Sequence, residues 1–418
     1  MNQVLVTGLG MICPLGADRH SSFAAALAAR SAVQMAPAGL VPRLPHLLLA
    51  PAAEPEPLLD KKYAGLDRAT QFALVAAQEA MADAGIATPP ADPTRFGVFV
   101  GIGFGGAQTG DSLYTRYFDT LHDPAQAHKN PTVMHPLSVP RMMANAAAAL
   151  VSMRYGLRGQ SSTYSVACAS SAVAVGDALR AIRHGYLDAA VVIGTEAMLS
   201  PGSLMAWNAL RVMAKPDDSD PSRSCRPFAA DRSGFVLGEG AAALVLEGAA
   251  HAHSRQATVL AEVAGYGCSS DAQHMTAPSV AGQVSAMQQA LREAGMAPEQ
   301  VQYLNAHGTA TDAGDVTETQ SIRAVFGAAA DRLAVSSTKA VHGHLIGAGG
   351  ALEFALSIMA MNSGSLPPTA HLDQADPRCD LDYLPLQARH GCAIEAVMSN
   401  SFAFGGSNAA LLARRYAP

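Results

Sequence analysis

Hydrophobic positions along the chain alternate between two patterns. Segments such as 95–101 (RFGVFVG) and 189–197 (AAVVIGTEA) are apolar at nearly every position, whereas the segments between them place apolar residues at helical spacing. A run that is apolar on both faces is typical of a strand covered by helices on each side of its sheet. The pattern therefore predicts an α/β protein in which strands and helices alternate.

Part of this pattern occurs twice. Residues 76–86 (AAQEAMADAGI) and 286–296 (AMQQALREAGM), 210 positions apart, have helical periodicity and end in Ala-Gly, a helix-ending signal. Each leads into an extended run that ends in glycine. Two longer segments, 161–182 and 333–356, share the pattern of a strand, a tight junction and a helix. The sequence therefore predicts two similar halves.

The joint between the halves is predicted near residues 248–256 (GAAHAHSRQ), which are polar. We expect an N-terminal half over residues 1–250 and a C-terminal half over residues 251–418. Residues 34–59 hold six prolines, which resist regular structure. We expect an insertion loop with helical fragments there.

Composition narrows the class of protein. The 418 residues are 49% hydrophobic and 15% charged, and a net charge of −6 gives no reason to expect a nucleic-acid partner. No run is long and apolar enough to span a membrane, and the N-terminus lacks the basic start of a signal peptide. The six cysteines form no CxxC pair, so most of them are expected to be reduced and buried. These features predict a protein of the cytoplasm.

One cysteine stands among small residues. Cys168 lies in SVACASS (165–171) and opens the apolar helix predicted over 169–182. A helix N-terminus stabilises anions and can lower the pKa of a thiol. The small neighbours leave room for a ligand. Taken alone, this stretch favours a buried structural cysteine.

Two histidines occupy matching strand–helix junctions. His307 ends the strand predicted in NAHGTATDAGD (305–315), and His344 lies at the junction in SSTKAVHGHLIGAGGALE (336–353). Strands of a parallel sheet present their carboxyl ends to ligands. We therefore predict that Cys168, His307 and His344 converge on one site.

Other motifs were weighed for chemistry. The glycine-flanked turn 400–408 (NSFAFGGSN) has backbone amides that could face a developing oxyanion, or it is a simple tight connection. The segment 101–106 (GIGFGG) matches G-x-G-x-x-G, but no strand ending in Asp or Glu follows about 20 residues on, which disfavours a dinucleotide site. No cluster has metal-ligand spacing, so no metal is expected.

Eight ordered segments, spanning nearly the whole chain, resemble the β-ketoacyl-(acyl-carrier-protein) synthases, and are closest to the type II condensing enzymes of the thiolase superfamily. The segments are VTGLGMICPLG (6–16), RYGLRGQS (154–161), ACASS (167–171), RPFAADRSGFVLGEGAAALVLE (226–247), SSDAQHMTAP (269–278), NAHGTATDAGD (305–315), SSTKAVHGHLIGAGGALE (336–353) and NSFAFGGSNAALL (400–412). The resemblance implies the thiolase fold, a five-layer αβαβα sandwich of two duplicated halves. This agrees with the internal repeat.

The resemblance also implies a mechanism. Cys168 would take an acyl group from the phosphopantetheine of an acyl carrier protein, with the backbone N–H groups of Cys168 and Phe404 as the oxyanion hole. His307 and His344 would bind the thioester oxygen of malonyl carrier protein and stabilise the enolate left by decarboxylation. The carbanion would attack the acyl group and give a 3-oxoacyl chain two carbons longer. No metal or nicotinamide is implied, and no cofactor beyond the phosphopantetheine of the carrier protein.

The resemblance also implies supporting roles for residues at matching positions. Thr309 and Thr311 match residues that hold the pantetheine arm. Lys339 and Glu318 resemble the charged pair that supports the histidines, and Asp315 would belong to the same network. The cysteine separates the chain from the chain-length-factor subunits, which lack it.

The chain departs from the family near the substrate. Phe404 resembles a gate that admits acyl chains, flanked by Gly405 and Gly406, but Ala403 stands where the family usually has glycine, and we expect altered gating. Three residues are expected at the substrate pocket: Phe402, Trp207 near its floor, and Met142 in a segment that reaches it across a dimer interface. Core packing is the alternative for Trp207.

Partners follow from the same resemblance. Acyl carrier proteins are acidic, so Arg211, helped by Lys61, Lys62 and Arg68, is predicted to steer docking. The segment 131–140 (PTVMHPLSVP) lacks the basic residues that relatives place near this surface. We expect a homodimer, or a heterodimer with a chain-length-factor-like subunit, and no nucleic acid or membrane as partner.

Two pathways stay open. One is housekeeping fatty-acid elongation, and the other is a specialised type II polyketide or aryl polyene pathway with a chain-length-factor-like partner. A non-catalytic scaffold is disfavoured because Cys168, His307 and His344 are all present. A degradative thiolase is disfavoured because thiolases use a second cysteine.

Overall fold

The computed structural model describes residues 2–125 and 134–417. The strands of its main sheet are β1 (Val4–Ile12), β4 (Phe96–Gly101), β5 (Ser161–Tyr164), β6 (Ala189–Glu196), β8 (Gly240–Gly248), β9 (Ala261–Ser270), β10 (Tyr303–Asn305), β11 (Ala334–Ser336), β12 (Ala396–Phe402) and β13 (Ser407–Arg414). Within the described residues these ten strands are hydrogen-bonded in the order β11-β10-β12-β13-β9-β1-β8-β6-β4-β5.

The two five-stranded halves of this sheet have the same topology. β5, β4 and β6 are parallel neighbours, followed by β8 and β1, each antiparallel to the strand before it. β11, β10 and β12 are likewise parallel, followed by antiparallel β13 and β9. The two halves of the sheet meet at β1 and β9, where the described chain has only two paired residues on each strand, Leu5–Glu262 and Val6–Ala261. The internal repeat predicted from the sequence is therefore a repeat of topology.

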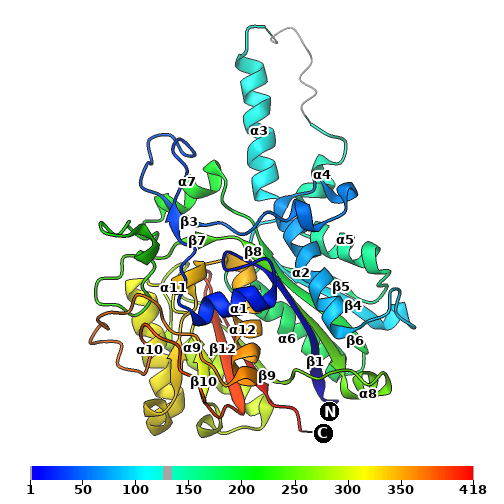
Figure 1. The fold of residues 1–418 in the computed structure, drawn as a ribbon, viewed down its shortest axis with the longest axis vertical. Helices are drawn as coiled ribbons and strands as arrows, with labels where there is room; N and C mark the ends of the chain where they lie inside the picture. Colours follow the sequence, from blue (N-terminus) through cyan, green and yellow to red (C-terminus); the bar gives the residue numbers. More distant parts are fainter. Residues whose placement is uncertain (1, 126–133, 418) are drawn as a thin grey trace.

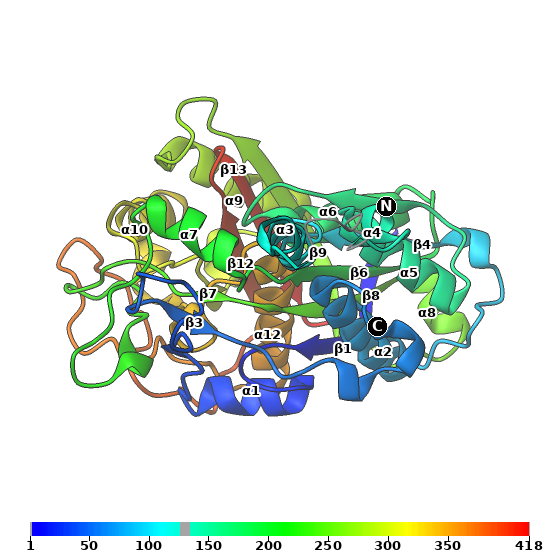
Figure 2. The same ribbon diagram turned by 90° about the horizontal axis from the view of Figure 1, so that it is seen from above.

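Helices complete five layers (Figure 1 and Figure 2). The helices of these layers are α2 (Arg68–Ala84), α5 (Ala146–Tyr155), α6 (Ser170–Arg183), α9 (Val280–Ala294), α10 (Asp312–Phe326) and α12 (Gly349–Ser363). α6 and α12 contact each other and strands of both halves, so they form the middle layer. α2 and α5 cover the outer face of one half, and α9 covers the other with α10 beside it. The predicted αβαβα sandwich is confirmed.

The repeated helix ends have one conformation. Gly85 follows α2 with φ 64°, and Gly295 follows α9 with φ 62°. Only glycine adopts this left-handed backbone at little cost, and it lets the glycine N–H bond the last turn of each helix. The Ala-Gly signal in the sequence therefore marks both helix ends.

The proline-rich insertion is more regular than predicted. It contains β2 (Gln34–Met35), β3 (Leu48–Ala50) and a 3-10 turn (Glu56–Leu58). β3 pairs with β2 on one side and with β7 (Leu237–Gly238) on the other, forming a second, three-stranded sheet. The partner strand lies almost 190 positions away along the sequence, so local pattern does not reveal this pairing.

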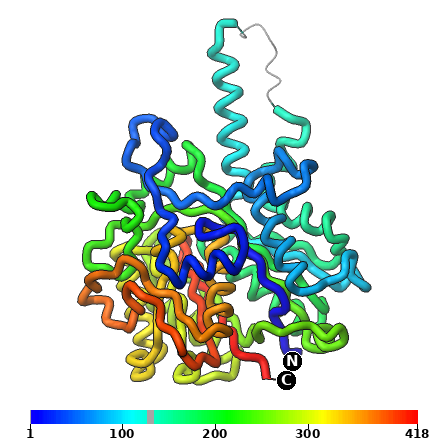
Figure 3. The backbone as a smooth tube through the Cα atoms, viewed as in Figure 1, coloured from blue at the N-terminus to red at the C-terminus, as the bar shows by residue number. Residues whose placement is uncertain are grey.

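The remaining helices lie around this frame. They are α1 (Arg19–Leu27), α3 (Ala107–His122), α4 (Ser138–Met142), α7 (Pro201–Ala209), α8 (Ala249–Ser254) and α11 (Lys339–His342). α3 stands out from the body of the molecule (Figure 1 and Figure 3). Residues 131–133 of the segment predicted to lack docking charges lie outside the described residues. No helix in the described ranges is long and apolar enough to cross a membrane.

Candidate active site

Cys168 lies in a sharp turn between β5 and α6. Ala167 adopts φ 46°, an uncommon conformation for a residue with a Cβ, immediately before the cysteine. The Ser170 hydroxyl accepts the Val166 N–H at 2.8 Å and donates to the Ala167 carbonyl at 2.7 Å. The turn therefore holds Cys168 just ahead of the first turn of α6, as the sequence predicted.

The two histidines reach the thiol from the other half. His307 follows β10, and His344 follows β11 and the short helix α11. The Nε2 atom of His344 lies 3.0 Å from the Cys168 sulfur, and the ring centroids of the two histidines are 5.4 Å apart. The three side chains that the sequence predicted to converge are thus together at carboxyl ends of strands.

A backbone contact fixes the tautomer of His344. The N–H of Ile346 donates to His344 Nδ1 at 3.3 Å, so Nδ1 is the acceptor nitrogen. The proton of the neutral ring then resides on Nε2, which faces the thiol. His344 can therefore donate a hydrogen bond toward an atom bound beside Cys168.

Glu318 holds the backbone at His307. Its carboxylate accepts the N–H groups of His307 at 2.9 Å and Gly308 at 2.8 Å, and the side-chain amide of Asn400 at 3.2 Å. One turn earlier, buried Asp315 accepts from the backbone N–H of Phe228 at 2.7 Å. Both acidic residues act on the segments around the histidines through backbone groups.

Lys339 pairs with a residue that sequence reasoning missed. Its ammonium bonds the carboxylate of Glu353, on α12, and both side chains are 1% exposed. Glu318 was expected to be the pairing partner, but it is occupied by backbone N–H groups. Glu353 follows Lys339 at a spacing of 14 residues in the same quoted motif, and that spacing carries no recognisable pairing signal.

Electrostatics in the site are dominated by burial. Burial and the positive charge of Lys339 hold the pKa values of His307 and His344 well below 6.5, so both rings are neutral. Burial raises the pKa of Cys168 to about 12, although Lys339 and the backbone N–H groups of Phe404 and Cys168 act to lower it. Desolvation therefore outweighs the lowering of the thiol pKa that a helix N-terminus can provide.

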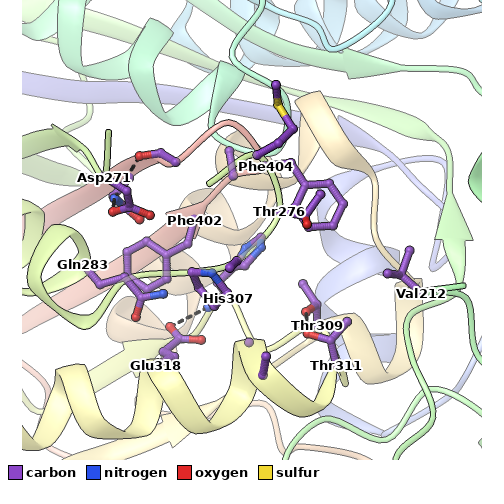
Figure 4. A pocket seen from close by; sticks show the side chains of 18 of the residues that line it. Val212, Asp271, Thr276, Gln283, His307, Thr309, Thr311, Glu318, Phe402 and Phe404 are labelled. Carbon is purple, nitrogen blue, oxygen red and sulfur yellow. Dashed lines mark hydrogen bonds between the residues drawn. The ribbon is translucent and has the colours of Figure 1, made fainter. Parts of the chain in front are cut away.

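A cavity of about 190 Å³ leads to His307. Figure 4 shows Phe402 and His307 on one side, and Thr309 and Thr311 on another, with their hydroxyls 3.0 Å apart. A smaller cavity of about 40 Å³ continues to Cys168, and Phe404 lines both. Phe404 therefore lies on the wall that the outer and inner cavities share.

Backbone hydrogen bonds hold the loop that carries Phe404. Gly405 donates to the carbonyl of Met275 at 2.7 Å, and Gly406 accepts from the N–H of Asp271 at 2.8 Å. Gly405 and Gly406 have φ values of 86° and 78°, whereas Ala403 has no positive φ. The alanine therefore fits this loop conformation without backbone strain.

Aromatic rings surround the inner cavity. Trp207 is stacked on Phe404 with ring centroids 6.4 Å apart and meets Phe235 edge-on at 5.6 Å. Its indole N–H points to the sulfur of Met198 at 3.4 Å. Trp207 lines the cavity beside Cys168 and is half-buried, so it is a pocket wall as well as a packing residue.

Some predicted residues are not brought to the cavity by this chain. Met142 lies on α4 and packs against Gly106 at the start of α3. The Arg68 guanidinium bonds Glu239 and Glu54, which leaves its side chain 18% exposed. Because these carboxylates occupy it, Arg68 is poorly placed for the docking role predicted from the sequence.

The other predicted docking cations remain at the surface. Lys61 and Lys62 are exposed on a 3-10 turn, Lys61–Tyr63, where Lys62 lies 3.7 Å from Asp60. Arg211 is exposed directly after α7, and its neighbour Val212 lines the outer cavity. Among these three cations, only Arg211 is next in sequence to a residue that lines the outer cavity.

Glycines of the GIGFGG motif allow neighbouring segments to pack closely. A Cβ at Gly101 would lie 2.3 Å from the backbone of Ser171, on the helix that follows Cys168. A Cβ at Gly105 would lie 2.4 Å from the backbone of Ala144. Close approach of these segments therefore explains why both positions are glycine.

Comparison with known proteins assigns the class. The sequence model "Beta-ketoacyl synthase, N-terminal domain" matches residues 1–252, and "Beta-ketoacyl synthase, C-terminal domain" matches residues 260–373. The "3-oxoacyl-[acyl-carrier-protein] synthase 2" of Coxiella burnetii is 38% identical over 99% of this chain and 98% of its own.

Solved structures agree. A β-ketoacyl synthase from Burkholderia phymatum covers both chains fully, with a TM-score of 0.87 and 37% identity. The ishigamide ketosynthase/chain length factor also covers both chains fully, with a TM-score of 0.88 and 30% identity. The fold and the Cys-His-His site define a condensing enzyme of the thiolase fold. The chain belongs to the β-ketoacyl synthase family.

Proposed function

We propose that the chain elongates acyl groups by decarboxylative condensation with malonyl-acyl carrier protein, giving 3-oxoacyl-acyl carrier protein. The observation that carries this proposal is the 3.0 Å approach of His344 Nε2 to the Cys168 sulfur, with His307 beside them at the end of the cavity. Relatives that are named 3-oxoacyl-[acyl-carrier-protein] synthase support the substrate class.

The first step is acyl transfer to Cys168. The thiol gives up its proton, its sulfur attacks the thioester carbonyl of the acyl carrier, and the carrier's phosphopantetheine thiol leaves with a proton. The backbone N–H groups of Cys168 and Phe404 face the sulfur closely enough to favour its anion, so they are placed to bind the oxyanion.

The second step is decarboxylation. Neutral His307 and His344 donate hydrogen bonds to the thioester oxygen of malonyl carrier protein. When the carboxylate leaves as CO₂, its bonding electron pair moves into the enolate, which these donors stabilise. The enolate carbon then attacks the acyl carbonyl on Cys168, the sulfur leaves as the thiolate, and a proton restores the thiol.

Other residues support these steps. Thr309 and Thr311 hold the pantetheine arm at the cavity wall, and Phe402 packs beside His307. Glu318 fixes the backbone at His307. Burial keeps both histidines neutral, and the charge of Lys339, which is paired with Glu353, adds to this effect. These steps need no group beyond the phosphopantetheine of the carrier. A metal on the Cys-His-His cluster, whose ligand atoms lie within 4.8 Å of one another, would occupy the nucleophile.

Gating, partners and organisation belong to the same proposal. Phe404 gates the inner cavity on the loop of Ala403, Gly405 and Gly406. Arg211, Lys61 and Lys62 steer the carrier protein in the cytoplasm, and Met142 reaches the site of a partner subunit. The halves divide at 250/251, which the two family matches support.

A specialised pathway is the second candidate. The observation that favours it is the aromatic wall that Trp207, Phe235 and Phe404 place around an inner cavity of only about 40 Å³. Flat, conjugated acyl chains stack on such rings better than saturated chains do. A similar solved chain is titled as a ketosynthase/chain length factor, which supports a heterodimer in this case.

Intact-mass measurement after incubation with a panel of acyl carrier-protein thioesters tests the proposal. We expect an acyl adduct on the wild-type chain and none on Cys168→Ala. Preference for saturated acyl groups would support fatty-acid elongation, and preference for polyene or aryl groups the specialised pathway. An adduct of equal yield on Cys168→Ala would refute Cys168 as the nucleophile.

A further inference from the structure

A fully buried carboxylate lies beside the active site without a cation. Glu196 ends β6, its exposure is 0%, and in the described chain no lysine or arginine pairs with it. It accepts three backbone N–H groups instead: Gly103 at 2.7 Å, Phe104 at 3.2 Å and Gly347 at 3.0 Å. These three donors act to lower the pKa of Glu196, but burial outweighs them and raises it to about 8, so the group titrates near neutral pH.

Glycine is required on both sides of Glu196. A Cβ at Gly103 would lie 2.5 Å from Glu196 Oε2, and a Cβ at Gly347 would lie 2.8 Å from the same oxygen. The third residue of the GIGFGG motif is therefore glycine because the chain's own carboxylate occupies the space, where a phosphate would lie in a nucleotide-binding loop.

The same bonds lead directly to His344. Gly347 follows Ile346, which adopts φ 43°, a strained conformation for a β-branched side chain. The Ile346 N–H donates to His344 Nδ1 in that conformation. A strained turn persists only when its surroundings hold it, and the bond from Gly347 to Glu196 does so from the next residue.

We propose that Glu196 is a positioning residue for the condensation: it holds the turn 346–347 so that Ile346 keeps the proton of His344 on Nε2, facing the thioester oxygen. The proposal rests on the proposed function and adds a residue that neither motif nor charge pairing reveals. It also explains why the loop after β4 and the loop after His344 are tied to one side chain.

A purely electrostatic role predicts different behaviour. The charge of Glu196 acts to raise the pKa of Cys168, so a role through charge alone would make the thiol more reactive when the charge is removed. A positioning role predicts that His344-dependent decarboxylation falls when the geometry changes, whether or not the charge stays. Variants that separate charge from geometry therefore decide between the two.

Three variants provide this separation in a Cys168→Ala background, where malonyl-acyl carrier protein can lose CO₂ without an acyl acceptor. Glu196→Gln removes the ionisable group and turns one acceptor into a donor facing the Phe104 N–H. Glu196→Asp keeps an ionisable carboxyl group on a shorter side chain. Gly347→Ala keeps Glu196 and displaces the N–H, because its Cβ would lie 2.3 Å from the Gly103 nitrogen.

We expect all three variants to release CO₂ roughly tenfold to a hundredfold more slowly at saturating substrate, with little change in KM. Glu262→Gln is the matched control, since Glu262 is a buried carboxylate on β9 that pairs with Arg414 away from the site. The control should lose thermal stability but keep the rate. Parental rates in Glu196→Asp and Gly347→Ala would overturn the proposal.

A substrate-free measurement keeps the two proposals apart. In protein labelled with ¹⁵N-histidine, His344 should show an unprotonated Nδ1 in the parent and a mixture of tautomers in the three variants. An unchanged tautomer in all of them would overturn the positioning role even if the rates fall. If the parent releases no CO₂ while the tautomer shifts as expected, the proposed function fails and the role of Glu196 in holding His344 stands.

Discussion

The reactivity of the Cys168 thiol follows from its burial. Burial raises its pKa to about 12, so the thiolate is a small fraction at neutral pH. Alkylation by the neutral reagent iodoacetamide, followed at Cys168 by peptide mass spectrometry, should therefore quicken about tenfold per pH unit from pH 7 to 10 without a plateau. A plateau below pH 9 would show a thiolate already formed. Half-buried Cys392, in the same digest, serves as the internal reference.

Ala403 affects the gate by restricting the conformations open to the backbone, because its own conformation is unstrained. Its backbone has no positive φ, so glycine is not needed in this conformation, but glycine would open other conformations to the loop. Ala403→Gly should lower the free energy of unfolding by about 0.4–1 kcal/mol and change the chain-length preference of Cys168 acylation. Urea unfolding and a panel of acyl carriers measure the two effects. Unchanged acylation rates and preference would mean that Ala403 does not set gating.

At the scale of elements, the repeat makes a paired prediction. Gly85 and Gly295 end α2 and α9 with positive φ, and a Cβ at either position would meet nothing closer than 4.0 Å. Gly85→Ala and Gly295→Ala should each cost about 1 kcal/mol in urea unfolding, because only the backbone conformation is penalised. Gly248→Ala, at φ −61°, is the control with ordinary backbone. Clearly unequal costs at the two helix ends would contradict an equivalent role.

These helix ends show which parts of the fold the sequence reveals. Ala-Gly endings, apolar strands and strand–helix junctions are local signals, and together they predicted the repeat, the α/β class and the meeting of Cys168 with two histidines. The signal is local because helix capping and strand burial depend on neighbours within a few residues.

Contacts between residues far apart in the sequence could not be predicted from these local signals. Arg68 was predicted for docking, yet its guanidinium bonds Glu239, 171 positions away. Glu196, whose partners Gly103 and Gly347 lie 93 and 151 positions away, gave no local pattern. The net pKa of Cys168 also depends on how many segments close over it, which the helix start alone does not report.

At the scale of the whole molecule, Arg211 tests carrier-protein docking. Arg211 is exposed and its neighbour Val212 lines the outer cavity, so Arg211→Glu should raise KM for acyl carrier-protein substrates several-fold at low salt, and the difference should shrink as salt rises. Reaction with a free acyl-pantetheine thioester should be unaffected. Arg332→Glu is the control, because Arg332 is exposed at the opposite, amino-terminal end of β11. An equal rise in KM for both variants would contradict a local docking role.

The outer edge of the main sheet and α3 together predict a second subunit. β5 is one of the two edge strands, and no strand of the described residues pairs with its outer side. α3 stands out from the body (Figure 1) and exposes Tyr114, Phe118 and Leu121 at the helical spacing of a single face. Buried apolar surface stabilises association, so light scattering of the purified chain should give twice the mass of one chain, and the double variant Tyr114→Ser, Phe118→Ser should shift the mass toward one. Tyr186→Ser is the control, since this residue is 73% exposed on the turn after α6.

A chain that stays monomeric alone and pairs only when co-expressed with a chain-length-factor-like subunit would support the heterodimer. A dimer unaffected by the double variant would remove α3 from the interface.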